Sequence, residues 1–364
     1  MRNLAYEHLK RKMLISAKEK NVPMTVHFEL TPRCNLDCKM CYIHNAESNA
    51  LKDKELSREE WKRVFDEAYD CGMMFATLSG GECLLRTDFK ELYLHLWKKR
   101  VFITVMTNGT MVNGDILGFF QKYPPADVQI SLYGSSEENY LRVTGHRGFE
   151  KAVTAIRGFT ELKIPVHVAV TPSRYMGDDV INIHRLSKEN NFWCNPSEFY
   201  LANKRDESEK DDCELTIDEI VTLSKERALL SGPLKPVSFS LPHCGGDCTL
   251  APKGTICSAG KCAVSVSWDG TMNPCSMLPI GNVSVRGASY ADAWERTKEA
   301  AEEILLGMEC VGCPYDKLCP KCPAMRLTGL YTGHCNPKVC EVTRRLVAAG
   351  VKKLDDQVET SCDE

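Results

Sequence analysis

The sequence has little of what marks a protein that binds nucleic acid or enters a membrane. Its 46 Lys and Arg residues nearly balance its 49 Asp and Glu residues, and the net charge of −3 favours neither nucleic acid nor an anionic membrane as a partner. The N-terminus lacks the apolar core of a signal peptide, and no later stretch approaches the roughly 20 apolar residues of a membrane span. We therefore expect a cytoplasmic protein.

Cysteine, in contrast, is abundant, with 19 residues in a chain of 364. Disulfides do not persist in a reducing compartment, so clustered cysteines there indicate metal ligands or redox groups. Three of them stand in "RCNLDCKMCY", residues 33–42, and eleven lie between residues 244 and 340. The scattered remainder is more typical of small buried side chains. These residues are Cys71, Cys83, Cys194, Cys213 and Cys362.

Strand and helix patterns alternate along the first two-thirds of the chain. Runs rich in β-branched and aromatic residues predict six strands, at 25–30, 74–79, 101–107, 127–134, 165–171 and 196–202. Amphipathic segments predict helices at 56–72, 88–99, 149–163 and near 114–122 and 178–190. Such alternation implies an α/β fold with a parallel sheet, open or closed into a barrel, whose chemistry sits at the carboxyl ends of the strands.

The cysteine motif of residues 33–42 follows the first of these strands. Three thiolates can bind three irons of a cubane cluster and leave the fourth iron open to a ligand other than the protein, whereas a closed structural site needs four ligands. The alternative is a zinc site that His44 or a distant residue completes.

The spacing Cys34-x3-Cys38-x2-Cys41, followed by the aromatic Tyr42, resembles the signature of radical S-adenosylmethionine (SAM) enzymes. In that family the open iron is chelated by the amino and carboxylate groups of SAM, and one electron cleaves the sulfonium to give a 5′-deoxyadenosyl radical. The resemblance implies a partial (β/α)6 TIM-like barrel and an electron donor of the flavodoxin or ferredoxin type.

Three further motifs at strand ends match this family. "SGGE", residues 79–82, ends the second strand, and the resemblance implies that Glu82 holds the amino group of SAM. "TNG" at 107–109 ends the third strand, and "SLYG" at 131–134 ends the fourth. Arg142 and Arg147 flank the place where many relatives have an arginine, and surface positions on a helix are the alternative for both. The implied cofactor-binding residues are Tyr42, Ser79, Gly80, Gly81, Glu82, Asn108 and Ser131.

The C-terminal cysteines, from about 245 to 345, resemble the SPASM extension of radical SAM enzymes, which holds two auxiliary 4Fe–4S clusters. The pattern consists of Cys257-x12-Gly270-x4-Cys275 and the tight run "CVGCPYDKLCPKC", residues 310–322. The run has two residues before its last cysteine where the family usually has three. A pair of four-cysteine zinc ribbons is the alternative.

The resemblance implies a ligand set for each auxiliary cluster. The first cluster takes Cys257, Cys275 and Cys322, with a fourth ligand from Cys248, Cys244 or Cys262, or an open iron. The second takes Cys310, Cys313, Cys319 and Cys340, with Cys335 as a competitor of Cys340. With the N-terminal cluster, the chain would hold three 4Fe–4S clusters.

Little regular structure is expected in this C-terminal region. A hairpin over 263–275, with Asp269–Gly270 at its turn, is the one strand pair that the pattern predicts. Metal ligation would then substitute for a core. The expected domains are an N-terminal helical segment at 1–23, the radical SAM barrel at 24–240, the SPASM domain at 241–345, and a C-terminal helix and tail at 346–364.

Relatives with this extension modify peptides and proteins, so the resemblance implies a peptide or protein maturase. Its product would be a crosslink, a thioether, an epimerised residue or an oxidised one. The substrate could carry a leader peptide, although barely 25 residues precede the first strand and no leader-binding module is expected. The alternatives are a dehydrogenase or epimerase of a small sugar or cyclic alcohol, and a non-enzymatic electron-transfer protein. An epimerase needs a thiol that returns hydrogen, for which Cys83 and Cys194 are candidates.

Overall fold

The computed structural model describes residues 4–43, 48–195, 213–231, 254–255, 257–304, 313–315, 318–320, 322, 324 and 337–353. Its strands form one curved sheet in the order β6-β5-β4-β3-β2-β1-β7-β8-β9. Strands β1 to β6 pair in parallel with their sequence neighbours, which agrees with the predicted alternation. The strands are β1 (Thr25–Glu29), β2 (Phe75–Ser79), β3 (Phe102–Thr107), β4 (Asp127–Ser131), β5 (Val166–Ala169), β6 (Trp193–Asn195), β7 (Ala263–Val266), β8 (Thr271–Asn273) and β9 (Val283–Ser284).

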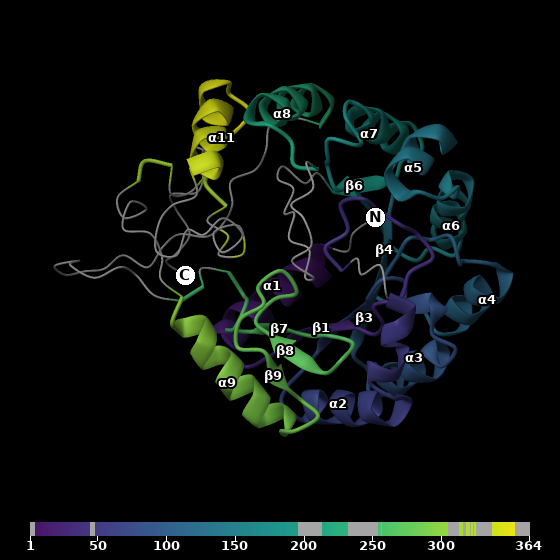
Figure 1. The fold of residues 1–364 in the computed structure, drawn as a ribbon, viewed down its shortest axis with the longest axis vertical. Helices are drawn as coiled ribbons and strands as arrows, with labels where there is room; N and C mark the ends of the chain where they lie inside the picture. Colours follow the sequence, from purple (N-terminus) through teal and green to yellow (C-terminus); the bar gives the residue numbers. More distant parts are fainter. Residues whose placement is uncertain are drawn as a thin grey trace.

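Helices α2 to α7 lie on the outside of this curved sheet, in an arc around the strands (Figure 1). The Ser57 hydroxyl and the Glu60 carboxylate form the predicted capping box at the start of α2. None of the helices that the structure describes is both long and apolar enough to cross a membrane. The helices are α1 (Leu4–Glu19), α2 (Arg58–Asp70), α3 (Phe89–Lys98), α4 (Gly114–Lys122), α5 (Glu137–Thr144), α6 (Phe149–Glu161), α7 (Asp179–Glu189), α8 (Ile217–Ser231), α9 (Tyr290–Glu302) and α11 (Pro337–Ala348), with 3-10 turns η1 (Ser48–Lys54) and η2 (Cys83–Leu85).

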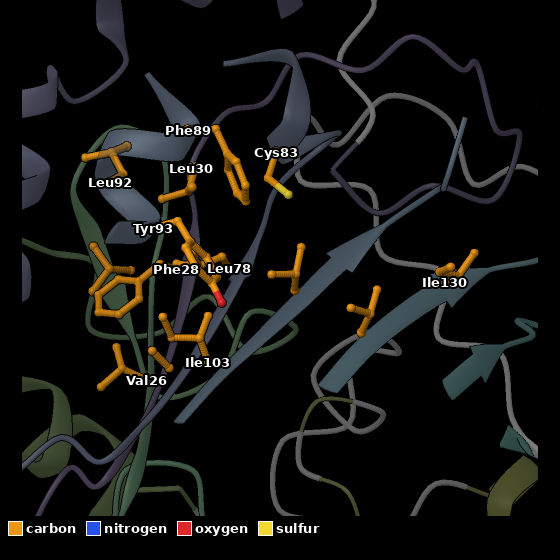
Figure 2. Close-up of a cluster of buried hydrophobic side chains, with 14 of the residues drawn as sticks. Val26, Phe28, Leu30, Leu78, Cys83, Phe89, Leu92, Tyr93, Ile103 and Ile130 are labelled. Carbon is orange, nitrogen blue, oxygen red and sulfur yellow. The ribbon is translucent and has the colours of Figure 1, made fainter. Parts of the chain in front are cut away.

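The core lies between the sheet and the outer helices, as Figure 2 shows for Val26, Phe28, Leu78 and Ile103. The Phe28 ring meets the Phe65 ring of α2 edge-on, with 4.8 Å between the ring centroids. Because side chains alternate across a strand, the residues between these apolar positions face the opposite, concave side. In register across four strands, that side carries His27, Thr77, Thr104 and Asp127.

The sixth strand begins earlier than the sequence predicted. Trp193–Asn195 pairs with β5, whereas the predicted range of 196–202 lies outside the described residues. Apolar residues stand both before and after Pro196. The run after Pro196 is the longer of the two, so it was predicted as the strand.

The expectation of little regular structure beyond residue 245 is wrong. The predicted hairpin is present as β7 and β8, but β7 also pairs in parallel with β1 and so extends the barrel sheet. Helix α9 places Tyr290 and Trp294 in the main hydrophobic core, and the Tyr290 amide donates to the Glu67 carboxylate at 2.8 Å. This part of the C-terminal region therefore has an apolar contact with the barrel in addition to any metal ligation.

Candidate active site

The cysteine loop begins where β1 ends and runs alongside the Ser79–Glu82 turn. The Leu30 amide donates to the Ser79 carbonyl, and the Gly81 amide to the Thr31 carbonyl, both at 2.8 Å. A Cβ atom on Gly80 would stand 2.4 Å from the Thr31 carbonyl oxygen, and one on Gly81 would stand 2.4 Å from that of Arg33. The glycine pair therefore admits the backbone of residues 31–33, which leads directly into Cys34.

A buried ion-pair network supports this backbone from the other side. The Glu55 carboxylate accepts from the Arg33 Nε at 2.7 Å and from an Arg86 Nη at 3.2 Å. Arg86 also donates to the Leu30 carbonyl at 3.0 Å and forms a two-point pair with Asp88. Breaking such a pair strands a buried charge at a cost of about 3–5 kcal/mol, so the network fixes the start of the loop firmly. Glu55 belongs to no motif, so the sequence interpretation missed it.

The three motif thiols lie close enough to influence one another. Burial raises the pKa of Cys34 to about 12, and the nearby Glu82 and Cys41 add to the effect. Burial likewise raises the pKa of Cys38, with further contributions from Cys41 and Cys34. Among the residues that the structure describes, no group of three or more His, Cys, Asp or Glu side chains is arranged to hold a metal ion.

Asn108, at the end of β3, connects the TNG motif to the cysteine loop. Its amide group donates to the Asn35 side-chain oxygen at 2.9 Å and to the Cys34 sulfur at 3.8 Å, while its own oxygen accepts from the Thr110 amide. The Leu36 amide also donates to the Cys34 sulfur, at 3.4 Å. These N–H groups supply the donors that a thiolate ligand needs, and Asn35 is a participant that the sequence interpretation missed although it lies within the motif.

Glu82 is fully buried, and the chain itself satisfies its carboxylate. The oxygens accept from the Thr107 hydroxyl at 2.9 Å, the Asn108 amide at 2.8 Å and the Leu84 amide at 3.0 Å. Burial raises the pKa of this carboxyl group. Glu82 therefore joins the ends of β2 and β3 beneath the cysteine loop, a structural task beyond the SAM contact that the sequence predicts for it.

We expect Glu82→Ala to lower the free energy of unfolding by about 2 kcal/mol. The variant leaves the buried Asn108 and Leu84 amides without their acceptor, and each unsatisfied group costs about 1–3 kcal/mol. The measurement is chemical unfolding followed by circular dichroism, with Glu91→Ala as the control. Glu91 is an exposed helix residue that pairs with Arg58 at 2.8 Å, and its removal should cost under about 0.5 kcal/mol. Equal stability of the two variants would contradict the structural role of Glu82.

The end of β4 places Ser131 and Tyr133 beside the same thiols. The Ser131 hydroxyl hydrogen-bonds the Tyr133 phenol, whose pKa is raised first by burial and then by the nearby Cys38. A Cβ atom on Gly134 would stand 2.3 Å from the Tyr140 amide nitrogen, so this glycine lets α5 pack closely against the turn. The sequence singled out Ser131 alone, although the same "SLYG" motif contains Tyr133.

Tyr42, next to Cys41, points its hydroxyl at a carboxylate on β1. The phenol donates to Glu29 Oε1 at 3.2 Å, and the Ser267 hydroxyl donates to Glu29 Oε2 at 3.3 Å. His27 stands two residues before Glu29 on the same face of β1, and its ring hydrogen-bonds the Ser79 hydroxyl. Two of the predicted cofactor-binding residues, Tyr42 and Ser79, thus hydrogen-bond titratable side chains that the sequence interpretation did not include.

The two candidate thiols for hydrogen return lie away from the concave face. Cys83 is fully buried, and its thiol donates to the Met106 carbonyl at 3.3 Å within the core. Cys194 stands in register with the buried Val168, on the side that faces the helices, and burial raises its pKa to about 11. Both positions favour the alternative of a small buried side chain.

Neither of the two candidate arginines points to the site in the described structure. Arg142 lies exposed on α5, where its Nε donates to the Tyr175 carbonyl at 3.1 Å. Arg147 is exposed as well. The position of Arg142 favours the helix-surface alternative, whereas Arg147 lies between α5 and α6 and on neither helix.

Three C-terminal cysteines of the first predicted auxiliary set lie near one another. Burial raises the pKa of Cys275, and the nearby thiols of Cys322 and Cys257 raise it further. Cys262 is fully buried near Cys257. Of the second set, Cys319 packs against Val339 and Cys322, and Cys340 occupies the first turn of α11. The remaining candidates, Cys244, Cys248, Cys310 and Cys335, lie outside the described residues.

Comparison with known proteins gives two matches to family models. Residues 28–187 match the radical SAM superfamily, and residues 257–323 match the SPASM iron-sulfur cluster-binding domain. The AdoMet-dependent heme synthase of Methanosarcina barkeri is 26% identical over 84% of this chain and 92% of its own length. The PqqA peptide cyclase of Rhodopseudomonas palustris is 27% identical over 86% of each chain.

Solved structures share the fold. The structure of anSMEcpe with bound AdoMet superposes with a TM-score of 0.66 at 17% identity, and covers 90% of this chain and 96% of its own. That of Streptococcus suis SuiB bound to its precursor peptide SuiA gives a TM-score of 0.62 at 14% identity, with 93% and 82% coverage. The predicted fold class, a partial barrel followed by an iron–sulfur domain, is thereby confirmed.

Proposed function

Because the chain is a radical SAM enzyme with a SPASM iron–sulfur domain, we propose that it modifies a peptide or protein substrate by hydrogen abstraction. The observation that carries this proposal is the similarity to PqqA peptide cyclase, which spans 86% of both chains and therefore both domains. The fold shared with SuiB, which was solved with a precursor peptide, is consistent with it.

The donor groups of the cysteine loop fit a cubane cluster with an open iron. The thiols of Cys34, Cys38 and Cys41 lie near one another in the loop that follows β1, and the Leu36 and Asn108 N–H groups donate to the Cys34 sulfur. We assign the cluster to Cys34, Cys38 and Cys41. A cluster and SAM bound there supply one-electron cleavage of the sulfonium and thereby the power to abstract hydrogen from an unactivated carbon.

The residues of this chain hold that chemistry in place. The Gly80–Gly81 turn and the Glu55 network fix the start of the loop, and Asn108 fixes its middle. The concave face of the sheet carries polar side chains on β1 to β4. These side chains would suit a polar substrate rather than a lipid. Glu82 and Ser131 remain the proposed contacts of SAM.

Two auxiliary clusters complete the proposed cofactor set. The proximity of Cys257, Cys275 and Cys322 supports the first, and the packing of Cys319 near α11 supports the second. Three cubanes would give about twelve irons per chain. A flavodoxin or ferredoxin is the proposed electron donor.

The similarity to AdoMet-dependent heme synthase favours a second candidate, in which the substrate is a heme precursor. It matches as much of this chain as the peptide cyclase does, at almost the same identity. The two candidates share the cysteine loop and differ in what occupies the concave face.

One incubation distinguishes the two candidates. The anaerobically reconstituted protein, with SAM and dithionite, is offered short peptides translated from the reading frames next to its gene and, separately, an iron tetrapyrrole precursor of heme. We expect a SAM-dependent change in the mass of a peptide together with 5′-deoxyadenosine, and an unchanged tetrapyrrole. Incubation without SAM is the control. A change in the tetrapyrrole while every peptide keeps its mass would refute the peptide proposal and support the second candidate.

A further inference from the structure

Glu29 is a carboxylate that the fold buries completely. It is the last residue of β1, and its exposed fraction is 0%. Val26 and Phe28 on the same strand face the helices, so Glu29 faces the concave side. Burial of a carboxylate is costly unless hydrogen bonds compensate for the lost water, so the partners of Glu29 indicate why it is there.

Two of those partners lie far apart in the sequence. The Tyr42 phenol donates to Oε1 at 3.2 Å, and Tyr42 is the neighbour of Cys41 in the cysteine loop. The Ser267 hydroxyl donates to Oε2 at 3.3 Å. Ser267 opens the turn of the β7–β8 hairpin, where its carbonyl accepts from the Gly270 amide at 2.9 Å, and β8 leads on to Cys275.

We propose that Glu29 is a positioning residue that couples the cysteine loop to the β7–β8 turn, and so holds the two predicted cluster-binding segments in one fixed arrangement. Each carboxylate oxygen accepts a hydrogen bond from one of these two hydroxyls. Movement of either segment therefore alters the contacts of the same side chain. The inference goes beyond the proposed function and does not depend on the identity of the substrate.

Ser265 provides a matched control for Ser267. It lies two residues earlier, on β7, and is similarly buried: 1% of Ser265 and 7% of Ser267 are exposed. Its hydroxyl donates to the Asn273 carbonyl at 3.3 Å, a bond within the hairpin rather than to Glu29. Loss of either hydroxyl should loosen the hairpin, but only loss of Ser267 should reach the cysteine loop.

The test is hydrogen exchange, measured by mass spectrometry on the anaerobically reconstituted protein. We expect Ser267→Ala to speed amide exchange in peptides covering 36–43 by about three- to tenfold, the range expected for loss of one ordinary hydrogen bond. Ser265→Ala should change exchange there less than twofold. Because coupling is reciprocal, Tyr42→Phe should speed exchange at 267–273 by a similar factor.

Variants of Glu29 itself distinguish a role as a hydrogen-bonding link between the two segments from a role of its negative charge. Gln can still bond both hydroxyls, since its amide donates as well as accepts, so Glu29→Gln should stay within about twofold of wild type at both segments. Glu29→Leu should speed exchange at both. If Glu29→Leu does not fold, the Tyr42 and Ser267 variants decide. The proposal is overturned if Ser267→Ala affects only the hairpin, as Ser265→Ala does, or if Tyr42→Phe leaves the hairpin unchanged.

Discussion

The variant with Cys34, Cys38 and Cys41 all replaced by Ala should contain about four fewer irons per chain than wild type after anaerobic reconstitution, because one cubane loses its ligands. Its barrel should remain folded, since the three cysteines are only half-buried and none belongs to the fully buried core. Iron is measured colorimetrically, and the fold by circular dichroism.

Cys71→Ala serves as the control for this variant. Cys71 is also half-buried but stands at the C-terminal end of α2 and belongs to no motif, and its loss should leave the iron content unchanged. An unchanged iron content in the triple variant would remove the cysteine loop from cluster binding altogether.

Gly81→Ala should displace the cysteine loop without touching a single ligand. The added Cβ would stand 2.4 Å from the Arg33 carbonyl oxygen and 2.7 Å from the Pro32 one, both backbone atoms that cannot turn aside. Forced overpacking of this kind costs about 1–3 kcal/mol, and we expect it to be relieved by movement of residues 32–34. The expected result is loss of the N-terminal cluster, again about four irons per chain, with a correspondingly lower midpoint of chemical unfolding.

Gly118→Ala is the matched control for Gly81→Ala. A Cβ there meets nothing within 4 Å, and the residue lies inside α4, where Ala is favoured over Gly by roughly 0.5–1 kcal/mol. This variant should keep its iron and gain slightly in stability. If Gly81→Ala behaves like Gly118→Ala, the close approach of the two backbones does not hold the loop.

The barrel was predictable from sequence because its signals are local. Strands β1 to β5 begin and end within a few residues of the predicted ranges, since alternating or continuous β-branched runs mark them and helices with clear start signals separate them. The eight-residue α5 was missed because it is short and stands between a strand and a longer helix. Helix α9 had the signals, with Ser289 as its N-cap and Tyr290 and Trp294 four residues apart, but the surrounding cysteines drew the interpretation toward metal ligation.

The site was predictable only where a motif names its residues. The three cysteines, the Gly-Gly-Glu turn, Asn108 and Ser131 all lie at strand ends, as the alternation of strands and helices requires. The motifs could not show which part of the chain each of these residues contacts. The glycines admit the chain's own backbone, and Glu82 turns its carboxylate toward β3.

Long-range partners gave no sequence signal at all. Glu55 meets Arg33 across 22 positions, and Ser267 meets Glu29 across 238. The second contact follows from the pairing of β7 with β1. Neither residue belongs to a spaced motif. Contacts of this kind follow from strand order, and the parallel pairing of β7 with β1 was not among the topologies that the sequence indicated.

Reductive cleavage of SAM tests the central claim most directly. The anaerobically reconstituted wild-type protein is reduced with dithionite and incubated with SAM, and 5′-deoxyadenosine is quantified by chromatography beside the triple cysteine variant. We expect wild type to form 5′-deoxyadenosine and the variant to form none above the level of a protein-free control. Cleavage that persists in the variant, or its absence from wild type with reduced clusters in place, would contradict the account.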